Sequence, residues 1–417
     1  MTRPHAVRRL AVALAAATLL LPGCGPIDDE ESAAPAVPAA SGPAADEAAD
    51  PDESNEAGHE AGHGLAATPA PTAKPKPLRR GEKRVTLAMP TPYTASAPTG
   101  VGTDDYRCFL LDPGLEKDAF LTGTNVLPGN SAVVHHVIMF QVPPDNLDTA
   151  QQMDDAEEGE GWTCFGNTGF GDSPVNALDD AQWLGAWAPG GTEQVIRAGF
   201  GTRLEKGTQV VMQVHYNLLA GTEPDISAMQ LRLAPATADL TELHMMLMPA
   251  PVELPCRSSN DHSPLCDRAT AVADVKERFG AGPGSTNDIL YFLCAGKPRA
   301  SETTSCLRTI GEPTTIRAAA GHMHLLGTSI KIEVNPGTPS ARTILDIPVW
   351  DFDDQGASPV DPIQLQPSET VKVTCRHSQE LRDRLPAFEG YRDDRYVIWG
   401  EGTTDEMCLG ILSVTRP

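Results

Sequence analysis

The chain has 417 residues, nine cysteines and a formal net charge of −24. This length allows two domains of ordinary size, and so acidic a chain excludes nucleic acid as a partner. The sequence contains no dinucleotide-binding loop, P-loop or GxSxG motif, so nothing in it favours the enzymes that depend on those motifs.

The N-terminal segment predicts export. Three arginines precede the apolar run from Leu10 to Leu21, which is typical of a secretory signal and too short to span a membrane. The run ends in Leu-Pro-Gly-Cys, which resembles a bacterial lipobox, so we expect a signal peptide over residues 1–23 and lipid modification of Cys24. The protein would then be anchored by lipid to a bacterial membrane, facing the periplasm or the cell surface. A plain secreted protein with an incidental cysteine is the alternative.

A linker is expected next. Residues 24–80 are rich in Ala, Pro, Gly, Ser and acidic side chains. Such a composition cannot bury enough apolar surface to offset the entropy lost on folding, so we expect a disordered tether.

Short apolar runs between Gly and Pro residues predict strands in the rest of the chain. Many of them alternate and are rich in β-branched residues, as the antiparallel strands of sandwiches and barrels are. The runs are Val85–Met89, Ala132–Val142, Val195–Phe200, Gln209–Leu219, Met229–Leu233, Leu243–Met248, Ile289–Leu293, Thr315–Ala320, Ser329–Val334, Thr343–Ile347, Val371–Cys375 and Leu409–Val414. The best helical periodicity covers Ala269–Phe279. We predict an all-β fold with two tandem antiparallel β-sandwich, jelly-roll-like domains over residues 81–235 and 236–417.

The cysteines predict disulfides. Apart from Cys24, an even number remains, which in an exported chain predicts up to four bridges. The eight are Cys108, Cys164, Cys256, Cys266, Cys294, Cys306, Cys375 and Cys408. No CxxC spacing occurs, which argues against a zinc ribbon or a thiol redox enzyme.

Two histidine pairs in apolar strand contexts suggest a metal site. His322 and His324 are two apart, so on a strand both point to the same side and can bind one ion. His135 and His136 are adjacent, so both reach one ion only at a bulge, a bend or a strand end. For each histidine, a buried ring bonded to a backbone carbonyl is the alternative.

Two further ligands are suggested by their surroundings. His215 lies in Val-His-Tyr, and Met407 lies in Glu-Met-Cys; the alternative for Met407 is a methionine that fills a gap in the core. Gln213 shares a strand face with His215 and either supports a cleft or is structural. Three other histidines fit no such pattern and are expected to be structural or solvated: His244, His262 and His377.

The order and spacing of HH, HY, HxH and EMC resembles the copper type II ascorbate-dependent monooxygenases, the family of peptidylglycine α-hydroxylating monooxygenase and dopamine β-monooxygenase. The resemblance covers roughly Val85 to Thr415 and includes Val214-His215-Tyr216 and Asp405-Glu406-Met407-Cys408. It implies two copper ions per chain, with ascorbate or a similar reductant as co-substrate.

The resemblance also implies how the ligands divide between two sites. The site of the first domain, which stores and passes an electron, would consist of His135, His136 and His215. The site of the second domain, where dioxygen binds and the substrate is hydroxylated, would consist of the catalytic residues His322, His324 and Met407. A soft thioether favours Cu(I), whereas three imidazoles serve both oxidation states of copper.

By the family's pattern, two disulfides are implied. Cys108 would pair with Cys164, and Cys375 with Cys408. The remaining four cysteines lie in or beside an insertion over residues 255–307, and the sequence leaves three connectivities open. This insertion either shapes the substrate cleft or decorates a loop.

The chain departs from the family where the peptide-amidating members bind a substrate carboxylate. Ala320, Leu409 and Ile411 replace the arginine, asparagine and tyrosine of those enzymes, so an anionic peptide terminus would lose its charge-assisted partners. With Met323, these residues suggest an apolar pocket for a small neutral or amine-bearing molecule.

These observations lead us to expect a monomeric copper monooxygenase that hydroxylates a C–H bond of a small organic substrate with dioxygen. A copper-binding or copper-storing lipoprotein without hydroxylase activity is the alternative from a different class, and a zinc protein is a third.

Overall fold

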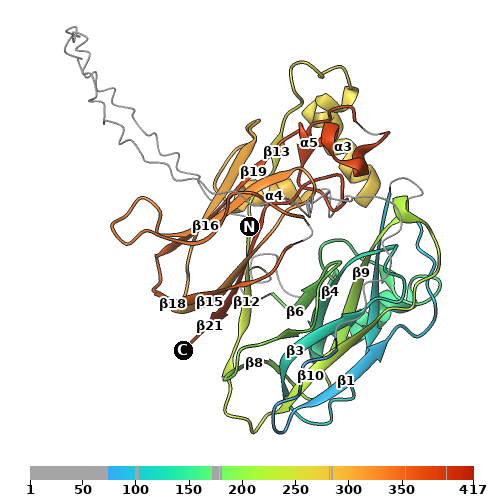
Figure 1. Cartoon of the computed structure of the whole chain (residues 1–417), viewed down its shortest axis with the longest axis vertical. Helices are drawn as coiled ribbons and strands as arrows, with labels where there is room; N and C mark the ends of the chain where they lie inside the picture. The colour runs from blue at the N-terminus through green and yellow to red at the C-terminus, as the bar shows by residue number, and fades with distance from the viewer. Residues whose placement is uncertain are drawn as a thin grey trace, which may run out of the picture. The chain divides into compact units, whose positions relative to one another are not determined.

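The computed structural model describes residues 74–98, 103–170, 178, 181–280, 282, 285–352, 354–390 and 392–417, all within one compact unit that spans residues 61–417. The expected signal peptide, Cys24 and the linker as far as residue 73 lie outside the described residues. The predicted all-β fold is confirmed, because the unit consists mainly of antiparallel sheets (Figure 1). Among these residues no helix has the length and apolar character needed to cross a membrane.

The first sandwich packs two sheets around one core. One sheet has the strand order β1 (Lys83–Ala88), β10 (Ala228–Pro235), β3 (Ala119–Leu127), β8 (Phe200–Leu204) and β11 (Thr241–Glu242), with β7 (Gln194–Val195) also paired to β3. The other has the order β5 (Trp162–Thr163), β2 (Asp104–Leu111), β9 (Gln209–Asn217), β4 (Val134–Val142) and β6 (Trp183–Trp187). Their facing side chains form a single apolar cluster.

The second sandwich is built in the same way. One sheet has the order β12 (His244–Pro249), β21 (Leu409–Thr415), β15 (Thr314–His322) and β18 (Ser358–Leu365). The other has the order β14 (Thr303–Thr309), β19 (Thr370–His377), β16 (Gly327–Val334) and β17 (Arg342–Ile347), and β13 (Glu253–Leu254) pairs with β20 (Val397–Ile398). Because β11 still belongs to the first sandwich, the chain passes to the second one at Leu243, slightly after the expected boundary at residue 235.

The helices of the described residues are few and short. They are α1 (Leu147–Asp155), α3 (Arg268–Phe279), α4 (Thr286–Leu293) and α5 (Leu381–Arg384), together with the 3₁₀ turns Pro144–Asn146, Leu218–Ala220, Pro264–Cys266 and Pro386–Phe388. The helix predicted over Ala269–Phe279 is confirmed as α3. Asp267 caps it, since its carboxylate accepts a hydrogen bond from the backbone N–H of Thr270 at 2.9 Å.

Strand β9 shows how the sequence positions a site outside the core. Its residues Val210, Met212 and Val214 belong to the core of the first sandwich. The intervening Gln213 and His215 therefore point to the opposite face of the sheet, because side chains alternate along a strand. Both are nevertheless fully buried, so other parts of the fold must cover that outer face.

Two predicted strands were wrong. Ile289–Leu293 belongs to helix α4, since the period of a five-residue apolar run does not separate a buried strand from a helix. Val195–Phe200 is interrupted by a turn, in which Phe200 N donates to Arg197 O and Gly199 has a φ of +90°. Glycine adopts such a left-handed backbone without strain.

The end of the expected linker is also ordered. Arg84 donates a hydrogen bond to the carbonyl of Lys76 at 3.0 Å, and Arg232 on β10 donates to the carbonyl of Pro77. The folded unit therefore begins before residue 81.

Four disulfides occur in the described residues. Cys108–Cys164 and Cys375–Cys408 are the two pairs that the family resemblance implies. Cys256–Cys266 and Cys294–Cys306 select one of the three connectivities left open by the sequence.

We predict that replacing Cys375 and Cys408 together by serine lowers the free energy of unfolding by about 3–4 kcal/mol, because the bridge closes a 33-residue separation in the unfolded chain. Denaturant unfolding followed by circular dichroism measures the loss. The double serine variant of Cys256 and Cys266, which are only 10 positions apart, is the matched control and should lose about 2–3 kcal/mol. Equal stability of the first variant and the wild type would contradict the prediction.

Candidate metal centre and cavity

The adjacent histidines of β4 lie on one side of the strand because it contains a β-bulge. The pairing of β4 with β9 shifts between Val134 and His136, which leaves His135 as the extra residue. Val134 and Val137 both belong to the core of the first sandwich, and the two histidines between them lie outside it. The condition that neighbouring histidines meet only at an irregularity of the strand is therefore fulfilled.

His215 on β9 completes a cluster with this pair. The Nδ1 atoms of His135 and His215 are 3.2 Å apart. The ring centroids of His136 and His215 are separated by 4.6 Å. One potential ligand atom from each of the three side chains lies within 4.8 Å of the others, so a single ion can be shared among them.

A buried carboxylate fixes the orientation of His215. Asp104 Oδ1 lies 2.8 Å from Nε2 of His215, so the Nδ1 atom is left to face His135. Thr403, far along the chain, donates to the same oxygen through its backbone N–H (3.2 Å) and its hydroxyl (2.9 Å). The ring of Tyr106 stacks on His215 with centroids 4.0 Å apart. Metal-binding histidines are commonly oriented by a carboxylate on the second ring nitrogen.

Burial keeps these imidazoles neutral. It lowers the pKa of His135 to about 4 and the pKa values of His136 and His215 well below the ordinary histidine value. Neighbouring histidines lower the last two further. A neutral ring offers the lone pair that a metal ion requires, so the cluster has the ligand form at neutral pH.

The second predicted ligand group lies where β15 meets β21. His322 ends β15 and pairs with Leu409, two residues after Met407. The rings of His322 and His324 are 5.2 Å apart, and Nδ1 of His322 is 2.6 Å from Oε1 of Gln355. Nδ1 of His324 is buried and has no hydrogen-bond partner among the described residues. Such an orphaned ring nitrogen costs free energy unless a ligand satisfies it.

Glu406 joins the two parts of this group. Its Oε2 atom accepts hydrogen bonds from the backbone N–H groups of His324 (3.0 Å) and Met407 (3.2 Å), and Oε1 accepts one from Leu326. Burial alone would raise the pKa of Glu406, but the charge and hydrogen bond of His377, with Nε2 at 3.4 Å, together with His324 outweigh this and lower it. The ionised side chain therefore holds the HxH segment against the strand that carries Met407. His377 has the structural role expected for it.

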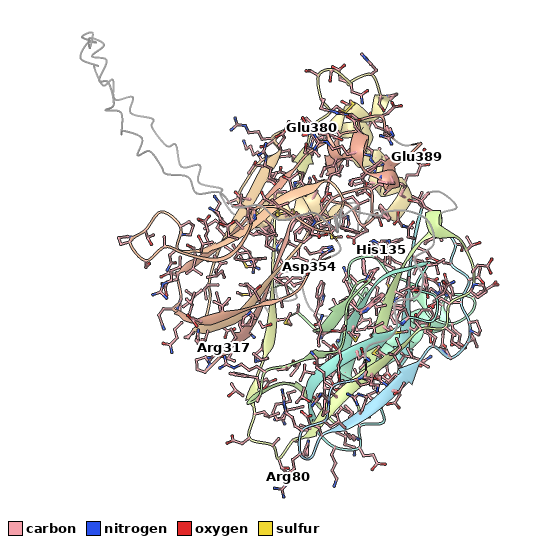
Figure 2. All side chains as sticks on the ribbon, viewed as in Figure 1. Arg80, His135, Arg317, Asp354, Glu380 and Glu389 are labelled. Carbon is pink, nitrogen blue, oxygen red and sulfur yellow. A yellow bond between two sulfur atoms is a disulfide. The ribbon has the colours of Figure 1, made fainter. Side chains whose placement is uncertain are left out.

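The two ligand groups are neighbours. The ring centroids of His136 and His322 are 6.4 Å apart, and His135 stacks on Phe352 at 5.1 Å. Figure 2 shows His135 opposite the segment that contains Asp354. The structure thus brings all six predicted ligands to one region of the compact unit.

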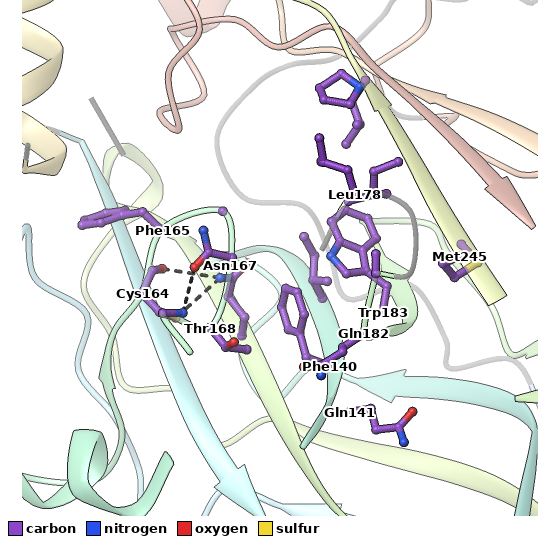
Figure 3. Close-up of a pocket in the computed structure, with 18 of the residues that line it drawn as sticks. Phe140, Gln141, Cys164, Phe165, Asn167, Thr168, Leu178, Gln182, Trp183 and Met245 are labelled. Carbon is purple, nitrogen blue, oxygen red and sulfur yellow. Dashed lines mark hydrogen bonds between the residues drawn. The ribbon is translucent and has the colours of Figure 1, made fainter. Parts of the chain in front are cut away.

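A cavity of about 990 Å³ adjoins both groups, and His136, His322 and Met407 line it. Figure 3 shows aromatic side chains at its wall, among them Phe140 and Trp183. The apolar part of its lining includes Phe140, Leu178, Trp183, Met245, Leu247, Leu290, Leu293, Trp399 and Leu409. Because Leu290 and Leu293 belong to α4, the Cys-containing insertion shapes this cavity.

The predicted pocket residues are only partly placed as expected. Leu409 lines the cavity, whereas Ala320, Met323 and Ile411 are not among the described residues that line it. Met323 is fully buried in the core of the second sandwich. Because Met323 packs in this core rather than at the cavity, its assignment to the pocket was wrong.

One carboxyl group in the cavity wall has no cationic partner among the described residues. Glu401 is only 4% exposed, and its Oε1 atom accepts a hydrogen bond from the Trp399 indole N–H at 3.4 Å. Its Oε2 atom is buried without a hydrogen-bond partner in the described part of the chain. Burial, assisted by repulsion from Asp405, raises the pKa of Glu401 to about 7.

The sequence did not point to Asp104, Glu401 or Gln355. Asp104 had one usable signal, since two adjacent acids at the start of an apolar strand are unusual and need buried partners. Glu401 and Gln355 belong to no motif. Their significance depends on contacts that only the tertiary structure creates.

Comparison with known proteins identifies no family for this all-β chain with a buried histidine cluster. No model of a known protein family matches it, and no curated protein does. Remotely similar solved structures include a subviral particle of infectious bursal disease virus (9% identity, 85% of this chain and 75% of that chain, TM-score 0.19). Others are allantoicase (10%, 81% and 90%, 0.18) and oxalate decarboxylase of Lactobacillus farciminis with formate (9%, 80% and 86%, 0.15). At these TM-scores the similarities carry no argument about function.

The raised pKa of Glu401 predicts a specific pH dependence of stability. The folded protein holds this proton up to about pH 7, whereas the unfolded chain releases it near 4.5, so stability is lost as the pH rises between these values. From pH 5 to pH 8 the wild type should lose about 2–3 kcal/mol of unfolding free energy relative to E401Q. Denaturant unfolding of both proteins at several pH values measures this. E205Q changes an exposed position, so its stability should depend on pH as that of the wild type does. If E401Q also shows the wild-type pH dependence, the raised pKa is not that of Glu401.

Proposed function

We propose that this protein is a copper-dependent monooxygenase that hydroxylates a C–H bond of a small organic substrate, using dioxygen and an ascorbate-like electron donor. The observation that carries the proposal is the presence of two different ligand sets beside one cavity. Three imidazoles form the first set, and the proposed second set combines His322 and His324 with Met407, which lines the same cavity as His322. Export, lipid anchoring through Cys24 and a monomeric state remain part of the proposal.

The donor atoms suit copper. His135, His136 and His215 would hold one ion through neutral ring nitrogens, and the Nδ1 atoms of His135 and His215 already face each other at 3.2 Å. The second ion would be held by His322, His324 and Met407, which would relieve the orphaned Nδ1 atom of His324. Imidazole suits both copper and zinc, so the thioether of Met407, which suits Cu(I) and is not a usual zinc ligand, is the donor that favours copper.

When bound, copper supplies the one-electron steps and the activation of dioxygen. The overall reaction consumes RH, O₂, two electrons and two protons, and it yields ROH and H₂O. The chain contributes orientation and shielding. Asp104 holds His215, Glu406 holds the second ligand group, and the apolar cavity walls position the substrate away from bulk water.

The cavity supports a substrate without a carboxylate. Leu409 lines it, Ala320 and Ile411 are paired across β15 and β21 nearby, and none of these can pair with an anion. Glu401 adds a buried negative group to the wall, and the guanidinium of Arg203, which also lines the cavity, is paired with Asp118. A neutral or amine-bearing molecule suits this lining better than a peptide terminus does.

A copper-storage protein is the competing proposal, because it would use the same ligands. The large apolar cavity favours the enzyme, since storage requires no substrate space. Oxygen consumption by the copper-loaded protein with ascorbate separates the two. The enzyme should consume dioxygen above a free-copper control with at least one member of a panel of amines, amides and aromatic compounds, and its failure with all of them would support storage.

Replacing Met407 tests the second site. M407I removes the thioether, so we expect copper binding to fall from two ions to one per chain and oxygen consumption to fall to the free-copper rate. M245I is the matched control, because Met245 lines the same cavity in the same apolar cluster but is not a proposed ligand. Copper analysis after desalting and an oxygen electrode provide the readouts. Full activity of M407I would rule out the assignment.

Replacing Asp104 tests the first site. D104N removes the charge that orients His215, so the first ion should bind about 10–100-fold more weakly while the second is unaffected. Titration against a competing chelator measures both affinities. D105N changes the next residue of β2 in the same way, but Asp105 bonds Tyr93 and Ser96 instead of a histidine. Equal copper affinities of D104N and D105N would contradict the role assigned to Asp104.

A further inference from the structure

Two side chains present unsatisfied acceptor atoms beside the cavity. Oε2 of Glu401 and Oε1 of Gln213 are buried, and neither has a hydrogen-bond partner among the described residues. Both side chains line the cavity that Met407 also lines. Buried polar atoms of native proteins are nearly always paired. Two orphaned acceptors at one cavity therefore indicate a ligand that donates hydrogen bonds.

The two acceptors are positioned by the same short segment, residues 164–166. The Gln213 amide nitrogen lies 3.5 Å from the carbonyl oxygen of Cys164. Gly166 makes room for the carboxyl group on the other side, because a Cβ atom there would lie 2.9 Å from Oε1 of Glu401. The disulfide between Cys108 and Cys164 ties this segment to β2. The acceptors are thus held by a braced part of the fold.

The charges around Glu401 favour a cationic ligand. No salt bridge from the described residues reaches its carboxyl group, since Arg278 and Arg395 are engaged by Asp405 at 2.7 and 2.5 Å. The other groups that face it are Asp405, the Trp399 indole and Tyr106, whose hydroxyl donates to the Glu401 backbone carbonyl. A buried carboxylate without a cation is costly, and an ammonium group removes that cost.

We propose that Glu401, assisted by Gln213, binds a protonated nitrogen of the ligand and thereby determines its specificity. An ammonium group supplies three donors, enough for both acceptors. The apolar walls, including Trp183 and Trp399, hold the rest of the molecule. The inference rests on the proposed function only in that it treats this ligand as the substrate.

Binding to the full-length chain without copper tests the inference separately from catalysis. Benzylammonium, benzyl alcohol and benzoate have similar shapes but different charges, and calorimetric titration at pH 8, where Glu401 is largely ionised, measures their affinities. The wild type should bind benzylammonium at least about tenfold more tightly than benzyl alcohol, and benzoate most weakly. E401Q should lose about tenfold in affinity for benzylammonium and keep its affinity for the alcohol.

Two variants act as controls. E205Q removes an exposed carboxylate from the same cavity lining and should keep the wild-type preference. E401D keeps the charge on a shorter side chain and should restore part of the preference, which provides a second test if E401Q folds poorly. The inference is overturned if the wild type binds none of the three compounds, if it binds ammonium and alcohol equally, or if E401Q retains the preference. Oxygen consumption with an uncharged substrate would leave the proposed function intact in each of these cases.

Discussion

The carboxylate of Glu406 is the interaction on which the second ligand group depends. It accepts hydrogen bonds from the backbone N–H groups of His324, Leu326 and Met407. The HxH segment therefore meets, on one anion, a strand end that lies at least 80 positions later in the sequence. Burying a carboxylate is unfavourable unless hydrogen bonds and nearby charge compensate, and the three N–H groups with His377 do so here. The disulfide of Cys408 then adds a covalent constraint directly beside Met407. The geometry of the ligands is therefore set by groups that are not ligands themselves.

Asp104 has the corresponding role in the first group, but its partners come from both sandwiches. It orients His215 on β9 and accepts two hydrogen bonds from Thr403, which precedes Met407 by four positions. Tyr106, stacked on His215, also donates to the backbone of Glu401. A displacement of the second sandwich would thus disturb the ring that the first sandwich presents. The two sandwiches are therefore joined beside the first ligand group by hydrogen bonds.

The sequence was informative where local chemistry decides the outcome. Most of the predicted apolar runs are strands, and the adjacency of His135 and His136 correctly required an irregular strand. It was uninformative where a long-range contact decides: the hydrogen bond between Asp104 and Thr403 joins residues 299 positions apart. The run Ile289–Leu293 shows a second limit, because the period of five apolar residues does not distinguish a strand from a helix. In the fold this run belongs to helix α4, and Leu290 packs in one cluster with Met407 and Trp399.

The three-histidine cluster depends on the number of residues in β4, because the bulge contains one extra residue. His135 and His136 are the only residues between Val134 and Val137, so removing one of them would restore regular alternation and leave a single histidine on the outer face. Exchange of a histidine for another residue leaves the backbone irregularity in place, whereas a one-residue gap abolishes it. In an alignment of related sequences, a gap at this point would therefore be stronger evidence for loss of the site than a substitution.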